Sequence, residues 1–193
     1  MKGKGKEQSK ELKVLAAIGS VLFGLVLIWV LWLKFGNADS ILFNYGQLLE
    51  LTAKERFLLD IEPFVRKPYH GENYWLEIAL NGFVLAPLGV TFNVIDKKRR
   101  VWLHVLICFL FSLGIETLQF FTMIGGFATA DLIMNTLSYF VGLIMYHLIF
   151  RWLPTKVNIV ICVLFICALC VALVFAVASV VEIKDTLAMI LCK

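Results

Sequence analysis

The sequence predicts an all-α fold, a polytopic membrane bundle of five transmembrane helices. The chain has 193 residues, of which 61% are hydrophobic, and its mean hydropathy of +0.87 is far above that of a soluble domain. Lysines and arginines gather at the ends of apolar segments, as in membrane proteins. Five apolar segments have about the 20 residues that cross a bilayer. They are residues 14–33, 76–95, 101–123, 132–150 and 157–181.

The first span, residues 14–33, follows a basic tail, residues 1–13. A signal peptide also starts with basic residues, but its apolar core has only about 7–15 residues and ends at a small-residue cleavage site. The apolar run of this chain is longer, and no clear A-x-A site follows it. We therefore expect an uncleaved membrane anchor.

A long outer loop, residues 36–75, connects the first span to the second. Thr52 and Glu55 have the spacing of a capping box, which predicts a short helix that Pro63 should end. We expect the charged residues of this region to form a solvated surface. They are Arg56, Asp60, Glu62, Arg66, Lys67, Glu72 and Glu77. The alternative is a cap over the outer end of the bundle, whose basic residues meet anionic headgroups or substrate.

The second span, residues 76–95, is the weakest of the five, because it contains Asn81, Pro87 and Gly89. Proline removes a backbone donor from a helix and collides with the preceding turn. We therefore expect Pro87 to kink this helix and to free carbonyl groups near Asn81.

The third and fourth spans, residues 101–123 and 132–150, are joined by the short connection 124–130. Helices joined by so short a connection pack as antiparallel neighbours. The sequence therefore predicts a helical hairpin at this point.

Small residues recur every four positions in the first and fifth spans, and such ridges let helix backbones approach closely. They are Ala16, Ser20 and Gly24, and Ala168, Ala172 and Ala176. We favour packing within one chain, and the alternative is a homo-oligomer. All five spans are expected to form one membrane domain, residues 14–181, followed by a tail of residues 182–193.

Lysines and arginines predict the orientation, because they are enriched on the cytoplasmic side. They precede the first span, separate the second span from the third at positions 97–100, and separate the fourth from the fifth as Arg151 and Lys156. With five spans these groups fall on one side, and the connection 124–130 on the other side has no charge. The N-terminus is therefore predicted inside and the C-terminus outside.

Glu116 is the only carboxylate in the third span. A charge at the bilayer centre costs roughly 2.5–3.5 kcal/mol on insertion scales, so such a residue is usually paired or faces a cavity. Ser112, Glu116 and Gln119 share one helical stripe by their i, i+4, i+7 spacing. At about 1.5 Å per residue, Glu116 lies roughly 22 Å from the cytoplasmic start of its span, in the outer half of the membrane.

Two other spans carry polar residues at a similar depth. Asp131, Asn135, Ser138 and Gly142 form one stripe of the fourth span, and Asn81 lies about one turn inside the second. We therefore predict a ligand-binding site that three helices line with Asn81, Glu116, Gln119, Asp131 and Asn135. The alternative is a structural hydrogen-bond network that holds the helices together.

His104 and His147 lie near the cytoplasmic ends of their spans. His104, Cys108, Ser112 and Glu116 repeat every four residues, which suggests a proton path along the third span. Each step of four residues drifts about 40° around a helix, so His104 ends roughly 120° from Glu116. Interfacial histidines are the favoured interpretation.

The sequence lacks the motifs of several other kinds of functional site. Cys167 and Cys170 form a CxxC without the second pair that a zinc site needs, and the five cysteines are interpreted as small packing residues. The sequence has no glycine-rich phosphate loop, no HExxH motif and no nucleophile elbow. We expect no cofactor and no metal ion. We also expect no nucleic-acid partner, because the basic residues mark span ends instead of one face.

Four short motifs, in this order along the chain, resemble the VanZ-like membrane family. They are Pro63-Phe64, Asn81 followed by Leu85-Ala86-Pro87-Leu88-Gly89, Glu116-Thr117-Leu118-Gln119, and Asp131 followed by Asn135-Thr136-Leu137. The resemblance covers about residues 56–150. Ser138 stands where the family usually has Gly, and residues 126–130 lack the Arg and the extra Asp often found there.

The resemblance implies a multi-pass protein of the bacterial cytoplasmic membrane, in a family whose named member is linked to resistance to teicoplanin, a lipid-bearing glycopeptide. Our first hypothesis is a non-enzymatic envelope protein among membrane lipids that binds a lipoglycopeptide tail or a lipid-linked cell-wall precursor in the outer leaflet. The second is a membrane enzyme or small transporter acting on a lipid, with Glu116 or Asp131 as catalytic acid or base or as proton carrier. The third is a packing network without a site.

Overall fold

Among the residues that the computed structural model describes, five helices are long and apolar enough to cross a membrane, which confirms the predicted number of spans. The structure describes residues 9–32, 59–66, 73–96, 100–122 and 126–191. The spanning helices are Lys10–Leu31, Tyr74–Ile95, Val101–Thr122, Thr129–Phe150 and Thr155–Ala178. The predicted capping box at Thr52 lies outside the described residues, but the prediction that its helix continues to Pro63 is wrong, because Leu59–Asp60 form a β-strand.

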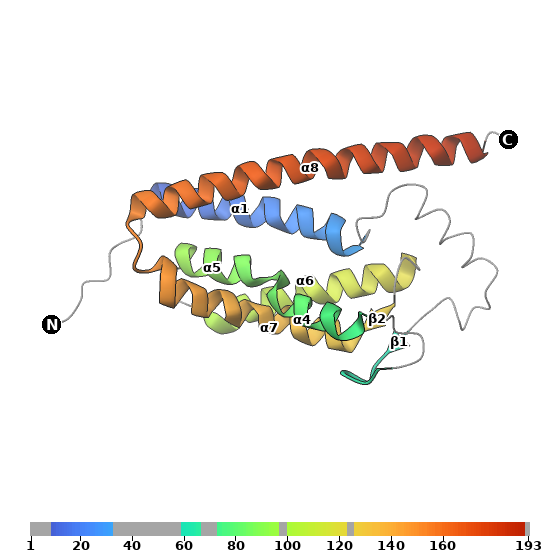
Figure 1. Ribbon diagram of the computed structural model, residues 1–193, viewed down its shortest axis with the longest axis horizontal. Coiled ribbons are helices and arrows are strands. Elements are labelled where there is room, and N and C mark those ends of the chain that lie inside the picture. Colours follow the sequence, from blue (N-terminus) through green and yellow to red (C-terminus); the bar gives the residue numbers. More distant parts are fainter. Residues whose placement is uncertain (1–8, 33–58, 67–72, 97–99, 123–125, 192–193) are drawn as a thin grey trace.

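Several spans are built from more than one helical element (Figure 1). The elements are α1 (Lys10–Leu27), η1 (Ile28–Trp32), β1 (Leu59–Asp60), α4 (Tyr74–Val84), α5 (Ala86–Ile95), α6 (Val101–Thr122), β2 (Phe127–Ala128), α7 (Thr129–Met145), η2 (Tyr146–Phe150) and α8 (Thr155–Leu191). Two of them, η1 and η2, are π-helical turns that end the first and fourth spans.

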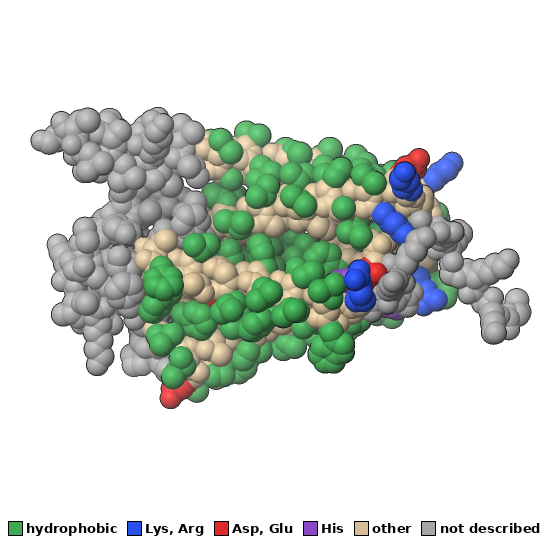
Figure 2. Space-filling view, turned by 180° about the vertical axis from the view of Figure 1, so that it is seen from behind, with side chains coloured by type: hydrophobic (Ala, Val, Ile, Leu, Met, Phe, Trp, Pro, Cys, Tyr) green, Lys and Arg blue, Asp and Glu red, His purple; other side chains and the backbone are tan. Residues whose placement is uncertain are grey.

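The two ends of the bundle differ in charge. Figure 2 shows hydrophobic side chains along the helices and lysines and arginines gathered at one end. We call this the basic end; it carries Lys10, Lys13, Arg100, Arg151 and Lys156. The opposite end, where β1 and β2 lie, we call the strand end (Figure 1). This separation of charge agrees with the predicted topology, while the orientation in the bilayer stays a prediction.

The second span breaks at Leu85, two residues before Pro87. Pro87 has no backbone N–H, so a continuous helix would lose a hydrogen bond there. The helix instead ends as α4 and restarts as α5 with Pro87 in its first turn. The predicted kink is confirmed, and the backbone group that finds a partner at the break is the N–H of Leu85, which donates to Ser138 Oγ at 2.8 Å.

Two glycines let α5 and α7 touch backbone to backbone. A side-chain carbon at Gly142 would collide with the carbonyl oxygen of Ala86, and one at Gly89 would collide with the carbonyl oxygen of Tyr139. Glycine is the residue that permits so close an approach. This contact fixes α7 against the half of the second span that runs to the basic end.

The small residues of the first span pack inside the bundle. Figure 1 shows α1 beside α8, and Ala16 and Gly19 are buried, with Phe165 of α8 against Gly19. Ser20 donates to Thr91 Oγ1 of α5 at 2.7 Å. Packing within one chain therefore uses this ridge, and a homo-oligomer through the ridge of α8 stays a prediction.

A short parallel strand pair joins the loop to the α6–α7 connection. Leu59 and Asp60 of β1 pair in register with Phe127 and Ala128 of β2. Asp60 is only 5% exposed, so the expectation that it belongs to a solvated surface is wrong. The pairing places Asp60 beside Ala128 and turns it away from water, while Glu62 of the same loop is exposed.

Candidate functional site

One face of α6 carries the polar residues of the third span into the bundle. Ser112, Glu116 and Gln119 are all buried, and Glu116 is 2% exposed. Their i, i+4, i+7 spacing puts them on one stripe, as the sequence predicts. The stripe faces the neighbouring helices, because the other side of α6 carries exposed apolar residues such as Leu110 and Leu118.

The Glu116 carboxylate reaches the strand pair. Glu116 Oε2 accepts a hydrogen bond of 2.9 Å from the backbone N–H of Ala128. Ala128 is also the register partner of Asp60. Two buried carboxylates therefore adjoin one residue of β2, about two helical turns from the strand end of α6.

Asp60 is a site residue that none of the four sequence motifs contains. Locally it is one acidic residue in a charged loop, although Leu59 and Ile61 flank it. Its burial depends on pairing with β2, which lies far along the chain. The apolar neighbours are the sequence signal that could have marked it.

Gln119 connects α6 to the end of the first span. Its Nε2 donates to the backbone carbonyl oxygen of Leu31 at 2.6 Å. Leu31 belongs to η1, a π-helical turn. Because such turns depart from the regular i→i+4 ladder, they are frequent near functional sites.

Asn135 lies in a second group of contacts, one turn from Glu116. Its Nδ2 donates to Ser112 Oγ at 3.2 Å, and Ser138 Oγ donates to the Asn135 carbonyl oxygen at 2.6 Å. Ser138 Oγ in turn accepts the Leu85 N–H. This group ties α6, α7 and the α4–α5 break together. Within the described part of the chain, the buried Asn135 Oδ1 has no hydrogen-bond partner.

The remaining two predicted residues are half-buried. Asp131 is in the first turn of α7, where the helix dipole favours a carboxylate. Asn81 lies in α4, which packs against α7. The structure thus buries Glu116, Gln119 and Asn135 and leaves Asn81 and Asp131 partly accessible. We use the name strand-end cluster for Asp60, Glu116, Gln119 and Asp131.

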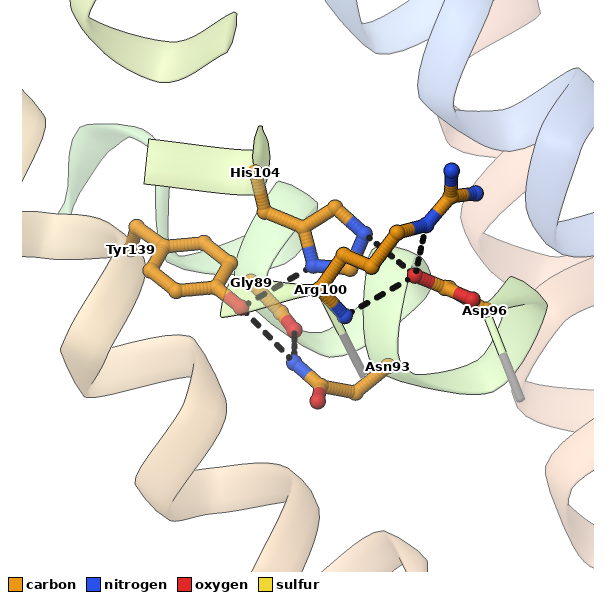
Figure 3. A network of polar contacts seen from close by, with 6 residues as sticks. All are labelled: Gly89, Asn93, Asp96, Arg100, His104 and Tyr139. Carbon is orange, nitrogen blue, oxygen red and sulfur yellow. Dashed lines mark hydrogen bonds and ion pairs between the residues drawn. The ribbon is translucent and has the colours of Figure 1, made fainter. Parts of the chain in front are cut away.

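A separate network of polar side chains lies toward the basic end (Figure 3). The sequence does not predict that these residues contact one another. His104 Nε2 is 3.3 Å from Asp96 Oδ2, and His104 Nδ1 is 3.1 Å from the Tyr139 hydroxyl. Asn93 Nδ2 donates to the Gly89 carbonyl oxygen at 2.7 Å and lies 3.4 Å from the same hydroxyl. We call these residues, with Arg100, the basic-end network.

His104 is buried. It lies near the basic end of its span, beside Asp96 at the end of α5, but its side chain does not face water. Its hydrogen bonds run sideways from α6 to Asp96 after α5 and to Tyr139 of α7, instead of along α6 toward Cys108. Tyr139 is fully buried. The arrangement holds three helices together by side chains that bond one another.

Metal ligands are not assembled in the described part of the chain. No group of three His, Cys, Asp or Glu residues there could hold a metal ion. Cys167 and Cys170 are exposed on α8, and Cys108 is buried in an apolar cluster with Leu85 and Tyr139. The strand-end cluster itself consists of three carboxylates, Asp60, Glu116 and Asp131, and the amide of Gln119.

Comparisons with known proteins bear on these motifs. Searches of curated proteins and of solved structures give no match. The family model described as VanZ/LLP1 matches residues 20–151, which include most of the first span as well as the region of the four motifs. Because the match covers more than half of the sequence, the chain belongs to the VanZ/LLP1 family.

Proposed function

We propose that this membrane protein of the VanZ/LLP1 family contributes to resistance against teicoplanin and related lipoglycopeptides. It does so by binding an amphiphile, either the lipoglycopeptide or a lipid-linked cell-wall precursor, in the outer leaflet of the bacterial cytoplasmic membrane. The strand-end cluster forms the binding site together with Asn81 and Asn135. The protein acts by sequestering or displacing the drug, and it performs no reaction.

The observation that carries the proposal is the pair of buried carboxylates beside Ala128. Asp60 and Glu116 come from segments far apart in the sequence and adjoin the same strand residue. A carboxylate has two oxygens that accept several hydrogen bonds, which suits peptide N–H groups, sugar hydroxyls and ammonium groups. Such donors are the polar part of a glycopeptide or of a wall precursor.

The position of the cluster supports an amphiphile. Polar donors would meet Asp60, Glu116 and Asp131 near the end of the spans, while the apolar surface of α4 and α6 lies beside them. Trp75, Leu76 and Phe121 are exposed large apolar residues at this end. A ligand with a lipid tail and a polar head would bury both parts.

Drug susceptibility of a resistant host tests the proposal. Asp60→Asn, Glu116→Gln, Asp131→Asn and Asn135→Ala variants are compared at matched protein levels for killing by teicoplanin and dalbavancin. We expect Asp60→Asn and Glu116→Gln to restore susceptibility. Glu62→Gln is the matched control, because Glu62 is exposed and two residues from Asp60, and it should leave resistance intact.

Unchanged resistance in all four variants at wild-type accumulation would contradict the proposal that these residues form a binding site. Resistance that is lost only in proportion to lower accumulation would favour a packing network.

A membrane enzyme or small transporter is the second candidate, and the half-buried Asp131 favours it. Unlike Glu116, Asp131 is partly accessible, so it could exchange a proton with a substrate. Mass spectrometry of the membrane lipids and wall precursors separates the candidates. An enzyme produces a changed lipid species that disappears in Asp131→Asn, and a binding protein does not.

A further inference from the structure

An apolar groove lies on the other side of the bundle, away from the strand-end cluster. It has a volume of about 360 Å³ and runs from the kink of the second span toward the basic end, between α1, α5, η2 and α8. Pro87 and Val90 of α5 line one side of it, and Ile161 and Phe165 of α8 line the other.

The groove has a buried floor and a rim that faces the bilayer. Leu12, Ala86 and Val94 on its floor are almost inaccessible, whereas Phe83 and Met145 at its edge are among the exposed large apolar residues. A depression of this kind on a spanning surface opens sideways to the hydrocarbon of the membrane. Its occupant therefore arrives from the bilayer.

The size of the groove suits a single acyl chain. An apolar cavity of about 150 Å³ holds one benzene ring, so the groove, with about 360 Å³, has room for roughly a dozen carbon atoms.

Basic residues adjoin the groove at the basic end of α1, η2 and α8. Lys13 follows the lining residue Leu12, Arg151 follows Phe150, and Lys156 comes two residues before Asn158. The acidic neighbours of this group are Glu11, which is exposed, and Asp96 at the end of α5, which is paired with Arg100 and His104. A surplus of basic groups at headgroup depth favours an anionic lipid.

Asn158 adds a polar contact at the same depth. It lines the groove, is 4% exposed, and its Nδ2 donates to the carbonyl oxygen of Phe150 at 2.9 Å. Its Oδ1 is buried and has no hydrogen-bond partner among the residues that the structure describes. A buried acceptor without a donor is costly, and a lipid hydroxyl at the groove would supply one.

We infer that the groove holds one acyl chain of an anionic glycerophospholipid in the leaflet at the basic end. The headgroup lies among Lys13, Arg151 and Lys156, and a headgroup hydroxyl donates to Asn158 Oδ1. This lipid site is distinct from the proposed drug or precursor site, because it lies at the opposite end of the bundle.

Native mass spectrometry of the full chain tests the lipid site. The detergent-solubilised protein receives equal amounts of dioleoylphosphatidylglycerol and dioleoylphosphatidylcholine. We expect the anionic lipid to be retained preferentially, and we expect Ile161→Trp, which fills the groove, to abolish this retention. Val160→Trp is the control, because Val160 is exposed on the adjacent position of α8 and does not line the groove.

Variants of the basic residues test the contact with the lipid headgroup. Each basic group near an anionic lipid strengthens binding about fivefold, so Arg151→Gln together with Lys156→Gln should lower retention roughly 25-fold. Arg66→Gln, an exposed cation at the strand end, should change nothing. Equal retention of both lipids, or retention in Ile161→Trp equal to that of the wild type, overturns the inference. So does a second protein copy that Ile161→Trp displaces in place of lipid.

A labelling measurement on the unmutated protein tests the same site without depending on whether a variant folds. Cys162 lines the groove, whereas Cys167 and Cys170 are exposed on the same helix. Labelling with N-ethylmaleimide, read by peptide mass spectrometry, should fall several-fold at Cys162 when phosphatidylglycerol is added. The labelling of Cys167 and Cys170 should not change. Equal labelling of Cys162 with and without that lipid counts against the groove as its site.

Discussion

The two ends of the bundle bury polar groups in different ways. At the basic end, Asp96, His104, Tyr139 and Asn93 bond one another through side chains. At the strand end, the described bonds of Glu116 and Gln119 go to backbone groups, the Ala128 N–H and the Leu31 carbonyl. The first arrangement ties helix to helix. The second ties a helix to a loop segment and to the last turn of a span.

This difference indicates which end can open. The strand pair has only two residues in each strand, and so short a pair is marginal by itself. Local opening starts where few contacts must break. We therefore expect the strand end to open before the basic end, where the basic-end network holds α5, α6 and α7 together.

Removing His104 should have the largest effect on stability. In His104→Leu, Asp96 and the Tyr139 hydroxyl each lose a buried partner, while Asp96 keeps Arg100 and the hydroxyl keeps Asn93. Each lost contact costs about 1–2 kcal/mol. We expect a loss of about 2–4 kcal/mol in unfolding by sodium dodecyl sulfate from mixed micelles. His147→Leu is the control, because the described bond of His147 goes to a carbonyl of its own helix. A loss in His104→Leu no larger than in His147→Leu would mean that the network does not hold the helices.

Removing one hydroxyl from the same network should have an intermediate effect. Tyr139→Phe keeps the ring in its fully buried position and leaves His104 Nδ1 without that partner. The expected loss is about 1–2 kcal/mol by the same measurement. Tyr146→Phe, a change at a second buried tyrosine of the fourth span, should cost less. Equal losses would show that ring packing, and not the hydroxyl contact, carries the effect.

Glu116→Gln should separate stability from function at the strand end. The amide oxygen of Gln still accepts the Ala128 N–H, so the unfolding free energy should fall by at most about 1 kcal/mol. Resistance should nevertheless be lost, since the negative charge is gone. A large loss of stability in this variant would make Glu116 a packing residue and would remove the contrast between the two ends.

The smallest effect is expected where the basic-end network meets water. Arg100 Nε is 3.2 Å from Asp96 Oδ2, but the Arg100 side chain is 61% exposed. Exposed ion pairs contribute about 0.2–1 kcal/mol. Arg100→Gln should therefore lower stability by about 0.5 kcal/mol or less, and added salt should reduce the difference. A loss of unfolding free energy as large as that of Tyr139→Phe would mean that the exposed part of the basic-end network stabilises the bundle as much as the buried part.

The sequence predicted the parts of the fold that depend on local pattern. Five apolar runs gave the spans, Pro87 gave the break at Leu85, and the spacing of Ser112, Glu116 and Gln119 gave the buried face of α6. These features follow from helix length, the missing proline donor and the 3.6-residue period.

The features that the sequence missed depend on contacts between distant segments. Asp60 is buried by a strand pairing that no local pattern encodes. Tyr139 meets His104 and Asn93 because α5 and α7 touch at Gly89 and Gly142. Periodicity shows which face of a helix is buried, but it does not show which residue of another helix lies opposite.

The length of α8 has a practical consequence for measuring topology. This helix has 37 residues, and the span predicted from the sequence ends at Val181, so 10 residues continue as helix beyond it. At about 1.5 Å per residue, this extension measures roughly 15 Å. A reporter enzyme fused after Lys193 would thus be carried clear of the lipid headgroups. Its activity would report the compartment on that side, and a silent fusion could not be attributed to shielding by the membrane.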